Sequence, residues 1–202
     1  MISQELGSKL IRYMKSKEWR IRPLNIVYLE DANADTWQPV QGRLDEWDDV
    51  RIIVSDKGVV LMSAEATCEP GAYYTYNPMN ERGAFRIAND VQFLDAWEFG
   101  YHHHQEALVQ CGEIIGFRDG NKDGIRPGDP KTQGNSFSVN QHTTGDSADS
   151  PAPDKVGRWS AGCLVGRYAV SHYNKFLPLV RSLGLETYDT AIIPGDKFAK
   201  FQ

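Results

Sequence analysis

Apolar residues at the start of the chain recur at the spacing of one helix face. Leu6, Leu10, Ile11 and Met14 predict an amphipathic helix over residues 3–17, within an N-terminal helical segment at 1–22. Short apolar runs bounded by turn residues then predict strands at 24–29, 50–54, 59–62, 84–87, 107–110, 113–117 and 137–139. A second helix is expected over 167–183, with Gly184 as its C-cap. This order predicts an α+β, β-rich fold, with a mixed sheet or sandwich core flanked by helices at both ends of the chain.

The length of 202 residues suits a single domain spanning 1–202. The formal net charge of −5 argues against a nucleic-acid partner, because phosphate binding needs clustered Lys and Arg. No apolar run approaches the roughly 20 residues that span a bilayer, and no signal peptide is evident. We expect a monomer, with Cys68, Cys111 and Cys163 as free thiols, since the sequence has no dense disulfide pattern.

One stretch brings together the residues needed for nucleophilic chemistry. Cys163 follows Ser160 and Gly162 in a tight segment, and His142 lies upstream, across a polar loop at 145–155 that is expected to form a wall or lid. A cysteine becomes a good nucleophile when a neighbouring base removes its proton, and His142 is the candidate base. Ser160 and the backbone N–H groups of Gly162 and Cys163 are candidate oxyanion donors. The residue that orients His142 is left open among Asn140, Asp146 and a backbone carbonyl, and the alternative is that Cys163 is a small buried apolar residue.

The motif region at 130–168 resembles the L,D-transpeptidase catalytic-domain family. The pattern His142, seventeen residues, then Ser160-Ala161-Gly162-Cys163 is similar to the family signature, in which Ala161 is usually His. The segment 132–139 is similar to the family strand that precedes the histidine. The resemblance implies an L,D-transpeptidase-like fold and a thioester formed on Cys163 from a peptidoglycan stem peptide.

The resemblance leaves two outcomes for that thioester. Attack by water gives an endolysin-like peptide hydrolase, which we favour, and attack by an amine gives transpeptidation. With no export signal in view, we expect cytoplasmic synthesis followed by action on the bacterial cell wall, as for a phage-encoded lysis protein. Arg158 and Arg167 flank the motif and suit a substrate carboxylate. We expect Trp159 and His102 to line the substrate cleft.

Two further patterns are typical of metal sites, although the cysteine chemistry requires no cofactor. Residues 119–124 resemble the opening of a calcium loop, so that Asp119, Asn121, Asp123 and Asp129 are candidate calcium ligands. A zinc amidase that uses His102, His104 and Cys111 is another alternative. The alternative from a different class is a non-catalytic calcium-binding or cell-wall-binding module of similar fold.

Overall fold

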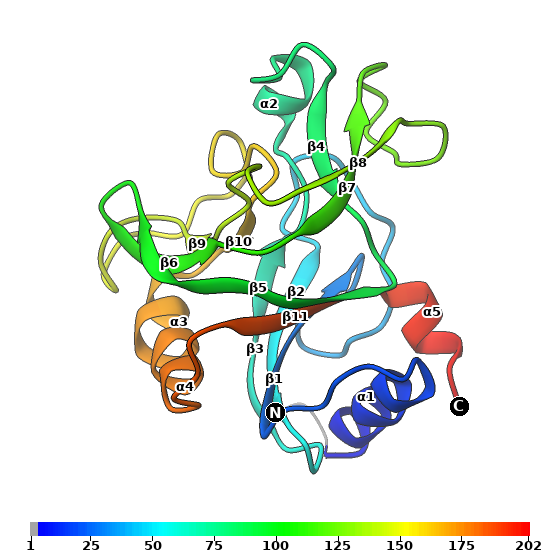
Figure 1. The fold of residues 1–202 in the computed structure, drawn as a ribbon, viewed down its shortest axis with the longest axis vertical. Helices are drawn as coiled ribbons and strands as arrows, with labels where there is room; N and C mark the ends of the chain where they lie inside the picture. Colours follow the sequence, from blue (N-terminus) through cyan, green and yellow to red (C-terminus); the bar gives the residue numbers. More distant parts are fainter. Residues whose placement is uncertain (1–3) are drawn as a thin grey trace.

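The computed structural model describes residues 4–202 and contains a closed eight-stranded barrel beside a three-stranded sheet (Figure 1). This architecture confirms the predicted β-rich α+β class. The barrel strands follow one another in the order β1 (Leu24–Glu30), β11 (Tyr188–Pro194), β5 (Val91–His102), β6 (Gln105–Gln110), β9 (Gln141–Thr143), β10 (Leu164–Gly166), β3 (Val60–Thr67) and β2 (Asp49–Ser55). The smaller sheet has the order β4 (Ala84–Ile87), β7 (Ile114–Asp119) and β8 (Lys131–Gly134).

Alternation along β1 and β2 produces two hydrophobic cores. Tyr28 and Ile53 face the barrel interior, whereas Val27 and Ile52 belong to a second core that includes the apolar face of helix α1 (Gln4–Ser16). Helix α5 (Gly195–Lys200) packs beside α1 in the same outer layer (Figure 1). Because both faces of these strands are buried, apolar residues stand next to one another along them, at 26–29 in β1 and at 52–54 in β2.

The remaining helices lie near the barrel and the small sheet. Helix α3 (Ala169–Ser171) continues through a π-helical turn (His172–Phe176) into α4 (Leu177–Arg181). Phe176, Leu177 and Val180 join the core inside the barrel. Helix α2 (Ala72–Tyr76) lies next to β4 (Figure 1). Among residues 4–202, no helix has the length and apolar character needed to cross a membrane.

Strands β9 and β10 are only three residues long and run parallel, with His142 in register with Val165. They close the barrel between β6 and β3, to which they are joined by very few backbone pairs. Additional bonds come from the Thr143 hydroxyl, which donates to the Gly166 carbonyl at 2.9 Å, and from the Thr144 hydroxyl, which donates to the Arg167 carbonyl at 2.6 Å. These side-chain bonds reinforce a seam that has little backbone pairing of its own.

A buried arginine supports this seam from inside the barrel. Arg51, on β2, donates from Nη2 to the carbonyl of His142 at 2.5 Å, and its Nη1 contacts Nδ1 of His172 at 3.0 Å. The guanidinium lies 4.4 Å from the ring centroid of Phe176, which provides a cation–π contact. The side chain reaches the seam because Gly166 has no Cβ, which would lie 2.6 Å from Arg51 Nη2.

The strands predicted at 24–29, 50–54, 59–62, 84–87, 107–110 and 113–117 are confirmed. The helical segment predicted over 167–183 is present between Ala169 and Arg181, but its C-cap is Ser182 and not Gly184. The strand predicted at 137–139 is wrong, because Ser138 has a φ of 56° that interrupts extended backbone. The N-terminal helix ends at Ser16, so the segment up to residue 22 is not helical, and its predicted first residue, Ser3, lies outside the described residues. Strands β5 and β11 were not predicted.

The close approach at Gly166 gives a stability prediction. Gly166→Ala is expected to lower the free energy of unfolding by about 1–3 kcal/mol, because the new methyl group overlaps the Arg51 guanidinium in a closed interior. Chemical denaturation measures the change. In the Arg51→Leu background the same substitution should cost less, and equal costs in both backgrounds would show that the two residues are not coupled.

Candidate active site

A cavity of about 530 Å³ opens beside Cys163. Its walls come from the segment after α2, from β4 and β7, from the β5–β6 turn and from the two segments that carry the predicted motif. The lining residues are Tyr74, Met79, Asn80, Phe85, His102, His103, Arg118, Ser136, Phe137, Ser138, Val139, Arg158, Trp159, Ala161, Gly162 and Cys163. A cavity of this size with a few polar groups is typical of a small-ligand site.

The parallel pairing of β9 with β10 brings Cys163 and His142 together. Cys163 immediately precedes β10 and His142 is the central residue of β9. The Cys163 sulfur and one ring nitrogen each from His142 and His102 all lie within 4.8 Å of one another. The Cys163 thiol lies 3.5 Å from both the backbone N–H of Asn140 and the carbonyl of Ser138.

The hydrogen bonds of His142 define its tautomer. Nδ1 lies 3.0 Å from the carbonyl of Thr143, which can only accept, so Nδ1 carries the proton. Nε2 therefore has a free lone pair, and it is buried without a partner among the described residues. Of the orienting groups left open by the sequence, the backbone carbonyl is the one in contact. A bare, oriented Nε2 is the form of histidine that acts as a general base.

His102 is held in the opposite tautomer. The Asn140 side-chain oxygen accepts from the backbone N–H of Gln110 at 3.0 Å, so its Nδ2 amide must be the group that contacts His102 Nδ1, at 2.9 Å. Because Nδ1 accepts there, the proton of neutral His102 lies on Nε2. The ring stacks on that of His142 with centroids 4.2 Å apart. His142 thus provides a free lone pair on its Nε2, and His102 provides an N–H donor on its Nε2.

The turn before Cys163 depends on Ser160 and Gly162. The Ser160 hydroxyl donates to the Cys163 carbonyl at 2.8 Å and accepts from the N–H of Gly162 at 3.1 Å. Gly162 has a φ of +124°, and a Cβ there would lie 2.6 Å from the carbonyl oxygen of Phe85. Since its hydroxyl is used within the turn and is fully buried, Ser160 shapes the loop instead of facing the cavity. The backbone N–H of Cys163 forms no hydrogen bond within residues 4–202 and is the remaining candidate for an oxyanion donor in this turn.

Burial keeps Cys163 and His142 neutral. It raises the pKa of the Cys163 thiol to about 11. Burial also lowers the pKa of His142 to about 3, with smaller contributions from the neighbouring His102 and from the Arg51 guanidinium. Near pH 7 both groups are therefore neutral, and transfer of the Cys163 proton to His142 is unfavourable.

Of the predicted substrate-binding residues, Arg158, Trp159 and His102 line the cavity, but Arg167 does not. Arg167 lies on another face, where it pairs with Glu65 at 2.8 Å. The loop at 145–155 contributes no lining residue, so it is neither wall nor lid of this cavity. The segment with Arg158 and Trp159 is held by Asp45, whose carboxylate accepts from the N–H groups of Gly157 and Ala72.

The sequence analysis did not predict that Arg118 lines the cavity, nor that Asn140 contacts His102. Arg118 reaches the cavity from β7, where the apolar pattern gave no signal for a functional residue. Asn140 was a candidate orienter of His142 but instead orients His102. Its position two residues before His142 was the only available signal.

The predicted calcium ligands are largely engaged by protein donors. Asp119 is fully buried, accepts from the N–H groups of Asp123 and Gly124, and pairs with Arg86 at 3.3 Å. The Asn121 amide donates to the Asp123 carboxylate at 2.7 Å. Calcium binding stays a prediction.

The predicted zinc trio is not assembled, because β5 ends at His102 and His103 turns the chain with a φ of 55°. Among the described residues, the histidine–cysteine cluster close enough to hold a metal is instead His102, His142 and Cys163. The Nδ1 lone pair of His102 is already used by Asn140, so that cluster presents only two free donors.

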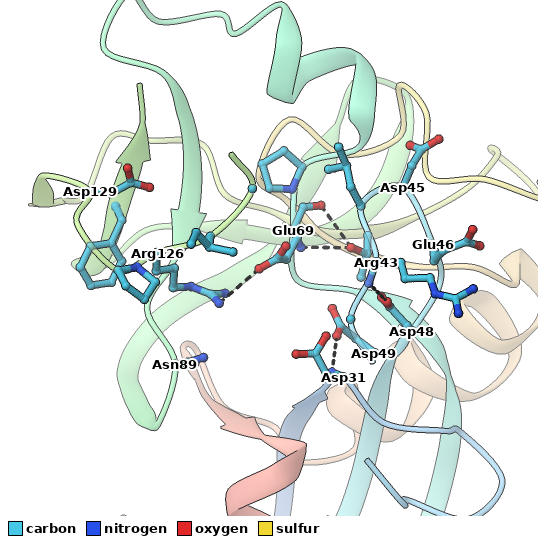
Figure 2. A pocket seen from close by; sticks show the side chains of 18 of the residues that line it. Asp31, Arg43, Asp45, Glu46, Asp48, Asp49, Glu69, Asn89, Arg126 and Asp129 are labelled. Carbon is cyan, nitrogen blue, oxygen red and sulfur yellow. Dashed lines mark hydrogen bonds and ion pairs between the residues drawn. The ribbon is translucent and has the colours of Figure 1, made fainter. Parts of the chain in front are cut away.

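A second cavity, also of about 530 Å³, is lined by acidic residues (Figure 2). Carboxylate oxygens of Asp31, Asp48 and Asp49 lie within 4.8 Å of one another. Burial and the neighbouring Asp48 carboxylate raise the pKa of Asp31 to about 6. Among its described lining residues there is no cysteine, serine or histidine, so this cavity lacks the nucleophile and base found beside Cys163.

No family model, curated protein or solved structure matches this chain significantly. The functional argument therefore rests on the geometry around Cys163.

The raised pKa of Cys163 predicts its reactivity in the empty site. Its alkylation by iodoacetamide, followed by peptide mass spectrometry, should accelerate about tenfold per pH unit from pH 7 to 9.5, because only the thiolate reacts. Cys163→Ala identifies the labelled peptide. A rate that is already constant between pH 6 and 8 would indicate a resting thiolate–imidazolium pair and contradict this result.

The acidic cavity gives a pH-dependent stability prediction. The pKa of Asp31 is about 6 in the folded protein and about 3.9 in the unfolded chain, so its carboxylate is more easily ionised when unfolded. Ionised Asp31 therefore lowers the free energy of unfolding. This destabilisation is complete above pH 6 and absent below about pH 4. Asp31→Asn should raise the melting temperature by about 1–2 °C at pH 7.5 and not at pH 4. Asp154→Asn, at an exposed carboxylate, is the control. A gain that is the same at both pH values would exclude the carboxylate charge as its cause.

Proposed function

We propose that this protein is a cysteine-dependent acyl-transfer enzyme that acts on peptide bonds of bacterial peptidoglycan. The observation that carries the proposal is the proximity of the Cys163 thiol, which lines a cavity, to the ring of His142, whose Nε2 has no partner among the described residues. The resemblance of the region 130–168 to L,D-transpeptidases supports the substrate class. The finer assignment, an L,D-transpeptidase-like domain, is part of this proposal.

In the proposed first step, the Cys163 sulfur attacks a substrate carbonyl while its proton passes to His142 Nε2. The negative charge on the carbonyl oxygen is stabilised by the free N–H of Cys163, and His102 supplies a second N–H donor at the cavity wall. Collapse of this tetrahedral intermediate breaks the carbon–nitrogen bond of the substrate, and the departing amine takes the proton from His142. A thioester on Cys163 remains.

In the second step, water or an amine loses a proton to His142 and attacks the thioester carbonyl, and the thiol is restored. Water gives hydrolysis and an amine gives transpeptidation. We favour hydrolysis, by an endolysin-like protein made in the cytoplasm and acting on the wall after release. Neither step uses a metal or other cofactor.

Digestion of purified peptidoglycan tests the nucleophile and the bond. The wild-type protein should release muropeptides that mass spectrometry identifies, and Cys163→Ser should lose activity by about 10³-fold or more. His142→Gln should lose activity similarly, because the thiol loses its base. Cys111→Ser is the matched control, since its thiol lies outside the cavity. Full activity of Cys163→Ser would refute the assigned nucleophile.

A further inference from the structure

The cavity beside Cys163 has a charge opposite to that of the whole protein. The chain carries 27 acidic and 22 basic residues, yet no Asp or Glu is among the described residues that line this cavity, and Arg118 and Arg158 both are. The acidic side chains gather at the other large cavity, which is lined by Asp31, Asp45, Glu46, Asp48, Asp49, Glu69 and Asp129 (Figure 2). Although Arg43 and Arg126 also line that second cavity, its formal charge is negative, whereas that of the Cys163 cavity is positive.

Arg118 has no carboxylate to neutralise it within the described part of the chain. Its guanidinium lies 5.3 Å and 5.4 Å from the ring centroids of Phe85 and Phe137, and its hydrogen bond to the carbonyl of Gly83 is 3.4 Å long. Its Nε is buried without a partner. Burial, with a contribution from the nearby Arg82, lowers the pKa of Arg118. An arginine that lies against two aromatic rings and has no acid partner presents free N–H donors to an anion.

The same aromatic residues connect Arg118 to the nucleophile. Phe85 contacts the turn at Gly162, whose backbone approaches the Phe85 carbonyl so closely that only glycine fits. Phe137 precedes Ser138, whose carbonyl lies 3.5 Å from the Cys163 sulfur. Arg118 thus lies over Phe85, which touches the Cys163 turn, and over Phe137, the neighbour in sequence of a residue that contacts the Cys163 sulfur.

Arg158 adds a second positive charge on another wall. Its guanidinium lies 3.7 Å from the ring centroid of Tyr73, and it too forms no ion pair among residues 4–202. The Arg167 side chain, by contrast, is neutralised by Glu65 on a different face. The positive character of the cavity therefore comes from Arg118 and Arg158.

We propose that the Cys163 cavity binds a substrate bearing a carboxylate close to the reacting carbonyl, with Arg118 as the principal residue that binds this carboxylate. The inference rests on the proposed function for its reaction, but the charge preference is measurable without a known substrate. Binding through Arg118 gives a role to a half-buried cation that has no acid partner among the described residues.

Alkylation of Cys163 by iodoacetate and iodoacetamide tests this charge preference at pH 9. Both reagents lose iodide as the thiolate forms the carbon–sulfur bond, but only iodoacetate carries a carboxylate. The iodoacetate-to-iodoacetamide rate ratio at Cys163, divided by the same ratio for glutathione, should exceed one by about three- to tenfold at low salt. Arg118→Gln should remove most of this preference, Arg118→Lys should keep much of it, and Arg167→Gln should leave it unchanged. High salt should reduce it.

The outcomes separate the two proposals. If iodoacetamide labels Cys163 but the normalised ratio is one or lower, or if Arg118→Gln leaves an elevated ratio unchanged, the carboxylate site is refuted and the nucleophile stands. If neither reagent labels Cys163 in the folded protein, whereas both label it after denaturation, the thiol is inert and the proposed function fails. If Arg118→Gln does not fold, Arg118→Ala and Arg158→Gln provide the same comparison, and an unchanged ratio in both would refute the inference.

Discussion

The parallel pairing of β9 with β10 is the contact on which both the barrel and the candidate site depend. It closes the barrel between β6 and β3, and its register sets His142 opposite Val165 and therefore close to Cys163. Because the two strands are short, much of the support comes from side chains, above all from Arg51 inside the barrel. Loss of this pairing would open the barrel and separate nucleophile from base in the same event. Fold stability and site geometry are thus two results of one strand register.

The buried charge below the seam also determines the chemical state of the site. Arg51 disfavours a second positive charge on His142, and burial disfavours a negative charge on Cys163. The Cys163 thiol is therefore protonated near pH 7, which lowers its reactivity toward electrophiles. Since no Asp or Glu is among the described residues that line this cavity, Arg118 and Arg158 keep their positive charge unpaired there.

The sequence predicted those parts of the molecule whose signals are local. The hairpin of β2 and β3 has clear apolar runs on either side of a turn, and the spacing of His142 and Cys163 pointed to their meeting. Strand β5 was missed because its apolar pattern is interrupted, with Asp95 at a φ of 50°. The roles of Arg51 and Arg118 depend on residues distant in sequence, so no local pattern could indicate them. The tautomers of the two histidines follow from hydrogen bonds that only the folded chain forms.

The glycine before the nucleophile has a consequence for how such proteins can diverge. At position 162 both the positive φ angle and the adjacent Phe85 carbonyl disfavour any side chain. A protein that keeps this turn is therefore expected to keep glycine at this position. At position 161 the side chain lines the cavity, so a substitution there changes the cavity wall. Position 161 is therefore expected to vary more than Gly162 and Cys163. Distant relatives are then expected to share this dipeptide, a histidine on the neighbouring parallel strand, and little else.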